Sequence, residues 1–436
     1  MTDGAKLHRV PYTESPSIRK ENTLSQLCRI LIITFAIGVA AAGSAAAQGW
    51  TPPDPSSDPW NTAKLKIGPF FMAPSFDLRD VGIDNNVFRT ETNPRQDLTA
   101  TFSVKTLFGV HLRAFNFRVT QENRYLWFRR YTSERSIDGG LSAIAEVRGQ
   151  RMRPWLSLSK MKSTERSGYE IDTRASRTTP DFETGLDFSF GLRTGLTASY
   201  KDTRTEYDEF QTYAGVDLKE ALDNRTTFAH VNARWAYTEY TDILGALEWS
   251  RNRFTYNPLR SGVTRAYMGG FQSHGDSPVT GRAQVGYKIQ QHDDPAVPDF
   301  TGVVFAASVT TIIMDRVKLD AIGDRDIQFS YDDHYPFYVQ QGGGLTLTGR
   351  IDPRLDLIGS ARSEWLHYSE TYLSAGLPLK SRTDLATVFG AGFLYSVGGP
   401  GGSHFGLTFE RAQRRSPLPG KTYRNDRVLT NLKFSF

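Results

Sequence analysis

Hydrophobic and polar residues alternate one by one along most of the chain from Leu65 onward. In the segment 112–127, "LRAFNFRVTQENRYLW", positions of one parity, the odd-numbered ones, include the apolar residues Phe115, Phe117, Val119, Tyr125 and Trp127. The same period of two recurs in the segments 227–237, 281–290 and 403–411. Because successive side chains of a β-strand point to opposite faces, this pattern predicts strands with one apolar face. No long segment has the period of an amphipathic helix, so we predict an all-β protein.

The chain ends on one of these strands, "RVLTNLKFSF". Its even-numbered positions include the apolar residues Val428, Leu432, Phe434 and Phe436. Its odd-numbered positions include the polar residues Asn431, Lys433 and Ser435. Chain ends fray unless something holds them, so a strand at the very end must pair along its length. We predict that it pairs with the first strand and closes the sheet.

A soluble sandwich buries the apolar face of each strand, whereas an outer-membrane barrel exposes that face to lipid. The strands predicted here often reach ten residues, as a tilted bilayer crossing requires, and soluble strands are shorter. Aromatic residues make up 12% of the chain. Many lie near strand ends, as an interfacial girdle would require: Tyr125, Trp127, Trp235, Tyr237, Trp249, Tyr287, Trp365, Tyr368 and Tyr395. These features favour the membrane barrel.

The connections between strands alternate in length, with eight short turns and nine longer polar segments. The longer ones include 80–96, 163–181, 202–225 and 412–426. The alternation predicts a transmembrane antiparallel up-and-down β-barrel of about 18 strands, with about 16 as the alternative. An even number places both chain ends on the periplasmic side and removes the open edge.

The N-terminal segment predicts export. A basic flank is followed by an apolar run of 13 residues, Ile30–Ala42, and then by Ala45, Ala46 and Ala47. This order is typical of a cleaved secretory signal, and the run is too short to span a bilayer as a helix. We therefore predict a signal peptide over 1–47, a Pro-rich periplasmic linker over 48–62, and an outer-membrane β-barrel over 63–436. An uncleaved anchor helix is the alternative.

The cysteine content and the net charge argue against two classes of protein, disulfide scaffolds and nucleic-acid binders. The single cysteine, Cys28, lies in the predicted signal, so the mature chain is no disulfide scaffold. Removing the five basic and three acidic residues of the signal from the 52 and 47 of the whole chain leaves 47 and 44, a net charge of +3. So small a surplus indicates no nucleic-acid partner.

Near the predicted mature N-terminus, Gly68, Phe70 and Pro74 precede the element Asp84-Asn85-Asn86-Val87-Phe88. This stretch resembles the start of the β-barrel porin family often found with exopolysaccharide gene clusters. The resemblance implies an outer-membrane barrel and, for some members, a link to polysaccharide export; it carries no catalytic residues onto this chain. Asp84-Asn85-Asn86 reads as a structural turn, because Asn and Asp bond their own backbone, with a binding role as the alternative.

The terminal Phe436, with Leu432 and Phe434 before it, resembles the C-terminal signal by which outer-membrane barrels are recognised for insertion. We therefore expect barrel-assembly machinery and outer-membrane lipids as partners. An ordinary last strand of a secreted β-protein is the alternative.

Motifs for catalysis are weak. Ser157–Lys160 matches S-x-x-K without the companion motifs of that chemistry. Asp332, Asp333 and His334, and also His292–Asp294, carry metal-capable side chains in predicted external loops, where such residues are usually solvated. We predict no enzyme activity, no metal and no cofactor.

The polar parity predicts the lining of a lumen. We assign five basic residues to an anion-attracting wall: Arg118, Arg234, Arg282, Lys288 and Arg362. The acids assigned to the same parity are Glu122, Glu248, Asp356, Glu364 and Glu410. A basic excess would favour anionic solutes, whereas pairing between neighbouring strands would only stiffen the wall.

Two functions remain from sequence. One is a porin-like channel for small or anionic solutes, with a link to exopolysaccharide export. The other is a structural or surface-binding barrel whose lumen is plugged, which an inward-folded long loop would produce.

Overall fold

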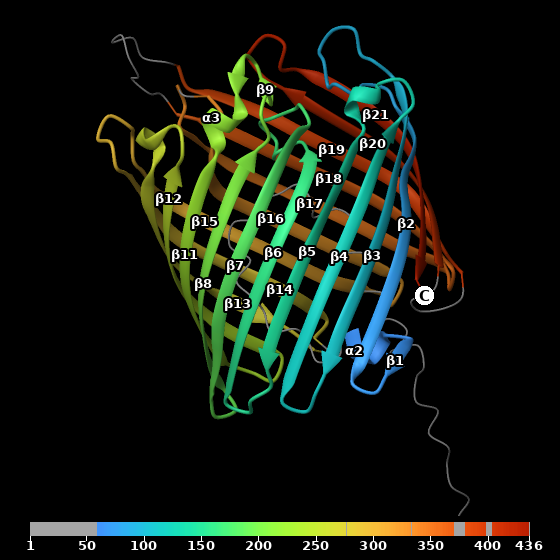
Figure 1. The fold of residues 1–436 in the computed structure, drawn as a ribbon, viewed down its shortest axis with the longest axis vertical. Coiled ribbons are helices and arrows are strands. Elements are labelled where there is room, and N and C mark those ends of the chain that lie inside the picture. The colour runs from blue at the N-terminus through green and yellow to red at the C-terminus, as the bar shows by residue number, and fades with distance from the viewer. Residues whose placement is uncertain (1–58, 276, 333, 370–379, 398–402, 436) are drawn as a thin grey trace, which may run out of the picture.

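The chain forms a closed antiparallel β-barrel (Figure 1). The computed structural model describes residues 59–275, 277–332, 334–369, 380–397 and 403–435. Eighteen strands of the main sheet, β2–β8 and β11–β21, pair in chain order, and the short β1 adds to the edge of β2. The predicted fold class and the preferred strand number are thus confirmed. The predicted signal, 1–47, lies outside the described residues.

The strands are long, as the bilayer requires. In the first half they are β1 (Leu65–Ile67), β2 (Phe70–Asp84), β3 (Asp97–His111), β4 (Phe115–Phe128), β5 (Ser136–Val147), β6 (Met152–Glu165), β7 (Ala175–Phe190), β8 (Thr194–Tyr207), β11 (Asn224–Ala236) and β12 (Thr241–Phe254). In the second half they are β13 (Gly262–Ser273), β14 (Val279–His292), β15 (Phe300–Ile313), β16 (Val317–Phe329), β17 (Phe337–Asp352), β18 (Leu355–Tyr368), β19 (Arg382–Val397), β20 (Ser403–Arg415) and β21 (Tyr423–Ser435). Two strands of two residues, β9 (Thr212–Tyr213) and β10 (Val216–Asp217), form a separate hairpin in the connection between β8 and β11.

Helical segments are few and short in the described part of the chain. They are α2 (Pro59–Thr62), α3 (Leu218–Leu222) and the single-turn segments Thr132–Glu134 and Pro258–Arg260. No helix among the described residues is long and apolar enough to cross a membrane. Helix α2 begins within the predicted linker, and its Trp60 ring lies 5.7 Å from Phe71 and stacks on His111 at 4.9 Å. The packed structure therefore includes residues of the predicted linker.

The barrel closes where β21 pairs with β2, as the terminal strand predicts. Phe434 lies opposite Phe76 and Leu432 opposite Leu78, and these rows face outward. A bulge at Asp80, whose φ is 54°, shifts the register by one residue. The backbone N–H of Asp80 donates to Oδ1 of Asn431 at 2.9 Å, so the bulge is fixed from the partner strand. Phe436 lies outside the described residues.

The connections between the strands alternate in length as predicted. Short turns lie at one end of the barrel, beside α2 and β1, and the nine longer connections lie at the other (Figure 1). Both ends of the described chain belong to the short-turn end, because β2 starts there and β21 finishes there. In an outer-membrane barrel the short turns are periplasmic and the longer loops are extracellular.

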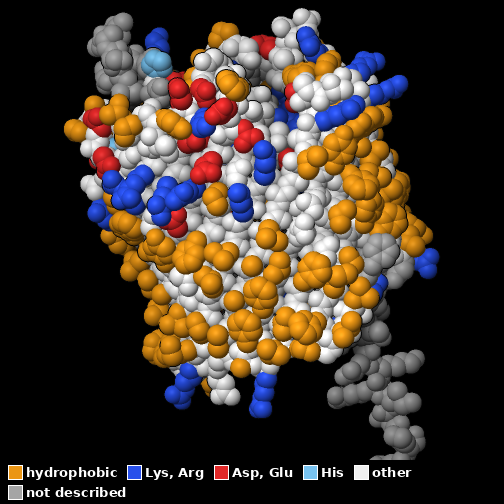
Figure 2. Space-filling view, viewed as in Figure 1, with side chains coloured by type: hydrophobic (Ala, Val, Ile, Leu, Met, Phe, Trp, Pro, Cys, Tyr) orange, Lys and Arg blue, Asp and Glu red, His pale blue; other side chains and the backbone are white. Residues whose placement is uncertain are grey.

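The two faces of each strand differ as the alternation predicts. Outward residues such as Leu247, Tyr267, Val285 and Leu345 are exposed and apolar. Together such residues form a hydrophobic belt around the barrel below the charged loop end (Figure 2). Inward positions carry polar and charged residues, and the buried apolar clusters lie mostly near the long loops.

We predict that the seam between β2 and β21 is sensitive to one added methyl group. A Cβ atom at Gly82 would lie 1.8 Å from the carbonyl oxygen of Val428, so Gly82→Ala must displace the closing strand. Overpacking of this kind costs about 1–3 kcal/mol. The folded barrel should resist SDS until heated, and the variant should shift to the unfolded gel band at a lower temperature than the parent.

Gly359→Ala on β18 is the matched control, because nothing lies within 4 Å of a Cβ atom at that position. An equal change in the transition temperature of both variants would contradict the proposed strain at the seam.

Candidate constriction inside the barrel

The connection between β6 and β7, residues 166–174, folds into the barrel instead of extending outward. Its last residue, Arg174, anchors its base. The guanidinium donates to the carbonyl oxygen of Thr164 at 2.9 Å, to Oγ of Ser136 at 3.0 Å and to the carbonyl oxygen of Glu134 at 2.5 Å. These contacts tie the loop to the neighbouring wall. We call residues 166–174 the inward loop.

The first residue of the inward loop, Arg166, joins it to the element Asp84–Phe88. Nη2 of Arg166 donates to the carbonyl oxygen of Val87 at 2.5 Å, and Nε donates to the carbonyl oxygen of Asp172 at 2.6 Å. Asn86 shapes that element, because its N–H donates to Oδ1 of Asp84 at 2.9 Å and its amide donates to the carbonyl oxygen of Thr90 at 2.9 Å. The predicted turn is confirmed, and it also supports the inward loop.

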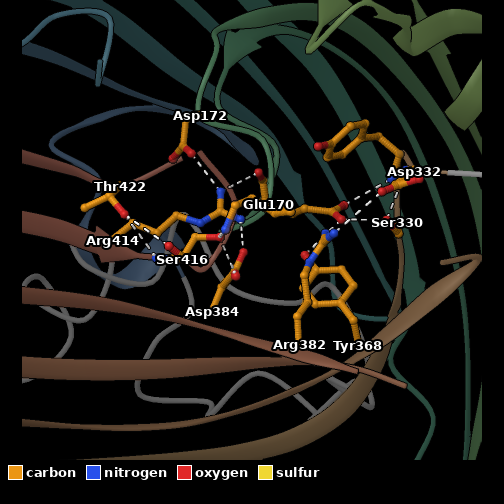
Figure 3. Close-up of polar contacts among 12 residues, drawn as sticks. Glu170, Asp172, Ser330, Asp332, Tyr368, Arg382, Asp384, Arg414, Ser416 and Thr422 are labelled. Atoms are coloured by element: carbon orange, nitrogen blue, oxygen red, sulfur yellow. Dashed lines mark hydrogen bonds and ion pairs between the residues drawn. The ribbon is translucent and has the colours of Figure 1, made fainter. Parts of the chain in front are cut away.

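The tip of the inward loop lies against Ser330 and Tyr368 (Figure 3). Glu170 is 2% exposed, and its carboxylate accepts from Ser330 Oγ at 2.5 Å, from Tyr331 N at 3.1 Å and from the Tyr368 hydroxyl at 2.9 Å. Ser330 and Tyr331 follow β16, and Tyr368 ends β18. In the strand order, β16 and β18 lie far around the barrel from β6 and β7, so the loop crosses the lumen.

Arg414 on β20 joins the inward loop to the wall by a second set of contacts. Its Nη1 donates to the carbonyl oxygen of Glu170 at 2.8 Å and to Oδ2 of Asp172 at 2.7 Å. Its Nη2 donates to Asp384 on β19. The three side chains are nearly fully buried, and removing one member of such a buried ion pair costs about 3–5 kcal/mol. We call Arg414, Asp172 and Asp384 the arginine node.

A second loop packs beside the inward loop. The connection between β8 and β11 carries α3, whose Asp217 caps the helix by accepting from the N–H of Lys219 at 2.8 Å. In the same connection, the hydroxyl of Tyr213 donates to Oδ2 of Asp172 in the inward loop at 3.2 Å. One apolar cluster unites both loops with the start of the β16–β17 connection: Ile171, Ala175, Tyr207, Leu218, Ala221, Leu222 and Tyr331. Apolar packing therefore adds to the polar anchoring of the inward loop.

Tyr368 does not belong to the lipid-facing girdle, so that part of the sequence prediction is wrong. Even-numbered residues of β18 face inward, and Tyr368 is 2% exposed, whereas Trp365 faces outward. The Arg382 guanidinium lies 3.8 Å from the Tyr368 ring and 4.6 Å from the Tyr335 ring. These stacked side chains form part of the surface against which Glu170 is seated.

Burial shifts the pKa of several groups in these loops. Burial raises the pKa of Glu170 above its usual value, although its three hydrogen bonds and Arg414 oppose the shift. Burial raises the pKa of Tyr169 to about 12. Burial, with Arg414 nearby, lowers the pKa of Lys421 to about 8. The Lys421 ammonium lies 3.5 Å from the ring of Tyr213. The packing of these loops is therefore coupled to the protonation of their buried groups.

The five basic residues assigned to the lumen lie on the inward parity, and four have acidic partners. Arg118 faces Glu146 at 3.8 Å, and Arg234 faces Asp242 at 3.1 Å. Lys288 contacts Asp326 at 2.6 Å, and Arg362 contacts Glu364 at 2.6 Å and Asp324 at 3.3 Å. Arg282 donates from Nε to Gln284 at 2.8 Å.

The acids that pair with these bases are mostly not those assigned from sequence. Glu146, Asp242, Asp324 and Asp326 share the inward parity but were absent from the predicted acidic set. The inward wall thus carries both signs in adjacent rows, which supports the pairing alternative. Arg362 also lies beside the inward loop, because its guanidinium is 5.7 Å from the ring of Tyr169.

The weak catalytic and metal motifs do not assemble into sites in the described part of the chain. Ser157 and Lys160 lie three residues apart on β6, so they point to opposite faces. His334 bonds Asp332 at 2.9 Å, and Asp333 lies outside the described residues. No group of three His, Cys, Asp or Glu residues among those described could hold a metal ion.

Sequence reasoning missed Glu170, Asp172, Asp384 and Arg414. The sequence pattern predicts only a longer polar connection over residues 163–181. The sequence contains one relevant feature, because the apolar Ile171 lies between two acids in a polar loop. It favours burial of that residue, which is 3% exposed, but does not indicate the path of the loop.

A family model described as "Putative beta-barrel porin 2" matches residues 58–436. The fold is similar to the crystal structure of Pseudomonas aeruginosa OccK2 (OpdF), with a TM-score of 0.50, 11% identity, and coverage of 84% of this chain and 98% of that chain. Pseudomonas aeruginosa OccK9 (OpdG) gives a TM-score of 0.49 and 10% identity over 84% and 98% of the two chains. Acinetobacter baumannii OccAB4 gives a TM-score of 0.47 and 10% identity over 86% and 100%. No curated protein sequence matches the chain at a significant level.

We predict that Arg414 keeps the inward loop inaccessible to solvent. A thiol introduced by Ile171→Cys should be protected from a water-soluble maleimide, because Ile171 is 3% exposed. In the Arg414→Ala background, loss of the buried pair should raise the labelling rate about 100-fold or more, since each 1.4 kcal/mol is a factor of ten. The rate is read by mass spectrometry.

Phe210→Cys is the control, because Phe210 is 87% exposed, and it should label rapidly in both backgrounds. Equal labelling rates of the Ile171→Cys thiol with and without Arg414 would contradict the anchoring role.

Proposed function

The chain belongs to the beta-barrel porin 2 family, and from this premise we propose that it is a gated porin-like channel for small solutes. In this proposal the inward loop closes the mouth of the lumen, and solutes pass when the loop leaves its seat. The 18-strand barrel is wide enough for an aqueous passage beside its wall side chains.

One observation carries the proposal, namely the arginine node that joins the inward loop to β19 and β20. The contacts that join Asp172 to Arg414, and Glu170 to Ser330, Tyr331 and Tyr368, are polar. Water or a charged solute can replace polar contacts far more readily than it can replace an apolar core. A loop held by polar contacts that water or a solute can replace is suited to act as a gate.

The class of solute that we propose follows from the charges on the inward face of the barrel wall. Because bases and acids alternate along the inward rows, we propose weak ion selectivity and passage of small polar solutes. The anion preference expected from sequence requires that bases such as Arg282 exceed the acids that face the water. The four ion pairs described above argue for a smaller preference.

A structural barrel with a plugged lumen is the second candidate. It is favoured by the near-complete burial of Glu170, Arg414 and Asp384, none of which is more than 2% exposed. In that case the loop never leaves its seat, and the outer surface carries the function.

The proposal also covers the export of the chain, the assembly of the barrel and its link to exopolysaccharide. We propose that the segment 1–47 directs export and is removed, and that Leu432, Phe434 and Phe436 are recognised by barrel-assembly machinery. A role in exopolysaccharide export is an expectation from the family resemblance, and an acidic oligosaccharide is the probe for it.

We predict that the parent conducts little in planar bilayers and that Arg414→Ala conducts much more. Removing the buried guanidinium takes the cationic partner from Asp384 and leaves Asp172 only the longer ion pair with Arg89, at 3.8 Å. Breaking a buried ion pair costs about 3–5 kcal/mol, and this cost falls on the closed arrangement. The measurement is single-channel conductance under a salt gradient, so that the reversal potential reports the ion preference of the open lumen. Block by an acidic oligosaccharide tests the larger substrate.

Arg411→Ala is the matched control on the same strand, because Arg411 pairs outside the barrel with Asp426 at 2.6 Å. Replacing residues 167–173 by two glycines is the second variant, which removes the inward loop and leaves Arg414 paired with Asp384. If neither this deletion nor Arg414→Ala conducts, the protein is a plugged structural barrel and the channel proposal fails.

We also predict that conductance depends on pH in both directions. In the open arrangement Glu170 and Lys421 are solvated, with ordinary pKa values near 4.5 and 10.5. In the closed arrangement the pKa of Glu170 is raised, so closure strengthens as pH falls through that raised value. The pKa of Lys421 is lowered to about 8, so closure strengthens as pH rises above about 8 toward 10.5. Conductance should therefore decline at both extremes.

Glu170→Gln should remove the acidic decline and Lys421→Met the alkaline decline, each without affecting the other. A profile that neither substitution changes would assign the pH dependence to other groups.

A further inference from the structure

Charged residues also lie on the outer face of the barrel, at the loop end above the hydrophobic belt (Figure 2). On β8, β11 and β12, the outward residues Arg204, Arg225 and Arg253 lie directly opposite one another in the strand register. Like charges in directly opposed positions of a sheet are destabilising. We call these three residues the arginine row.

Most of the positive charge of this row is not neutralised by the protein. Arg225 pairs with Asp202 at 2.8 Å. Arg204 and Arg253 are exposed and form neither a hydrogen bond nor an ion pair with any residue that the structure describes. A pair of free guanidinium groups beside a third indicates a site for an anion from outside the chain.

The height of the row on the barrel indicates where that anion lies. Tyr200 and Trp249 are outward, 40% exposed, and precede Arg204 and Arg253 by four residues on the same strands and faces. Interfacial aromatics mark the level where hydrocarbon meets headgroups. Four residues of a tilted strand rise about 10 Å, which places the row among the polar headgroups of the outer leaflet.

A groove continues from the row down the lipid-facing surface of β5–β8. It has a volume of about 480 Å³. Leu141, Leu158 and Phe182 line it with apolar surface, and Lys160, Asp202 and Arg204 lie along its charged part. Lys160, like Arg204, has no partner among the described residues. An apolar groove with free cations at one end matches the shape and charge of an acyl chain with a phosphate headgroup.

We propose that this surface binds an anionic, phosphate-bearing lipid of the outer leaflet. The guanidinium groups of the arginine row and the Lys160 ammonium contact the phosphate, and an acyl chain lies in the groove. Arginine binds phosphate oxygens by paired N–H donors, which makes it better suited to this role than lysine alone. The bound phosphate relieves the repulsion within the row. The site lies outside the lumen, so it does not depend on whether the channel opens.

The test uses the protein purified in detergent and native mass spectrometry with added lipid. The probe is dimyristoyl phosphatidic acid, and the reference is dimyristoyl phosphatidylcholine, which has the same chains but no net charge. The parent should retain phosphatidic acid preferentially. Arg204→Gln with Arg253→Gln should weaken that retention about 30-fold, as two basic residues near a lipid phosphate contribute.

Arg411→Gln with Arg424→Gln is the control, because it removes the same charge from outward residues that both contact Asp426. It should leave phosphatidic acid binding unchanged, and all variants should keep the heat-induced gel shift of a folded barrel.

Four results would overturn the proposal. The first is equal retention of the two lipids by the parent. The second is unchanged retention in the Arg204/Arg253 variant. The third is that inorganic phosphate, at the lipid concentration, displaces the probe completely, which would mean that the row binds phosphate without using the groove. A dimer that forms through this face and excludes lipid would likewise contradict it.

Discussion

The structure depends on the requirement that no backbone N–H or C=O group remain unpaired in hydrocarbon. An open sheet cannot meet this requirement at its edges, so β21 must find β2. Two features follow from closing an antiparallel sheet in a bilayer: alternating apolar and polar residues, and an even strand number. The bulge at Asp80, held by Asn431, shows that the seam is adjusted locally to keep outward residues outward on both sides of the shift.

Closure also creates an interior that is shielded from lipid. Within it, polar side chains can satisfy one another over distances in sequence that no local motif encodes. Glu170 and Tyr368 are 198 residues apart, and Asp172 and Arg414 are 242 apart. The inward loop exists because the wall supplies donors for its carboxylates and an apolar cluster for Ile171. Loss of either set would leave buried charge or exposed apolar surface.

This contrast explains what the sequence could predict. Strand parity, the alternation of the connections and the terminal pairing are local or repeated, and they are confirmed by residues such as Leu432 and Phe434 opposite β2. The turn at Asp84–Asn86 is local too, because its side chains bond their own backbone. The path of residues 166–174 was not predictable, since loop composition does not say whether a loop points outward or inward. Tyr368 was misassigned for a related reason: an aromatic at a strand end fits a girdle or a buried mouth equally well, and only the parity of β18 decides.

Whether an outward position of a strand carries a charged residue depends on its height on the barrel wall. Within the belt, an outward charge would face hydrocarbon, so bases such as Lys288 and Arg362 lie inward beside acids. Above the aromatic level, outward charge becomes acceptable, and β8, β11 and β12 there carry arginines on the face that is apolar lower down. The inward bases are paired by the chain itself, whereas Arg204 and Arg253 have no partner among the described residues. Because a folded chain could have placed acids within reach of these arginines, as Asp202 lies within reach of Arg225, their free state points to a partner that the membrane supplies.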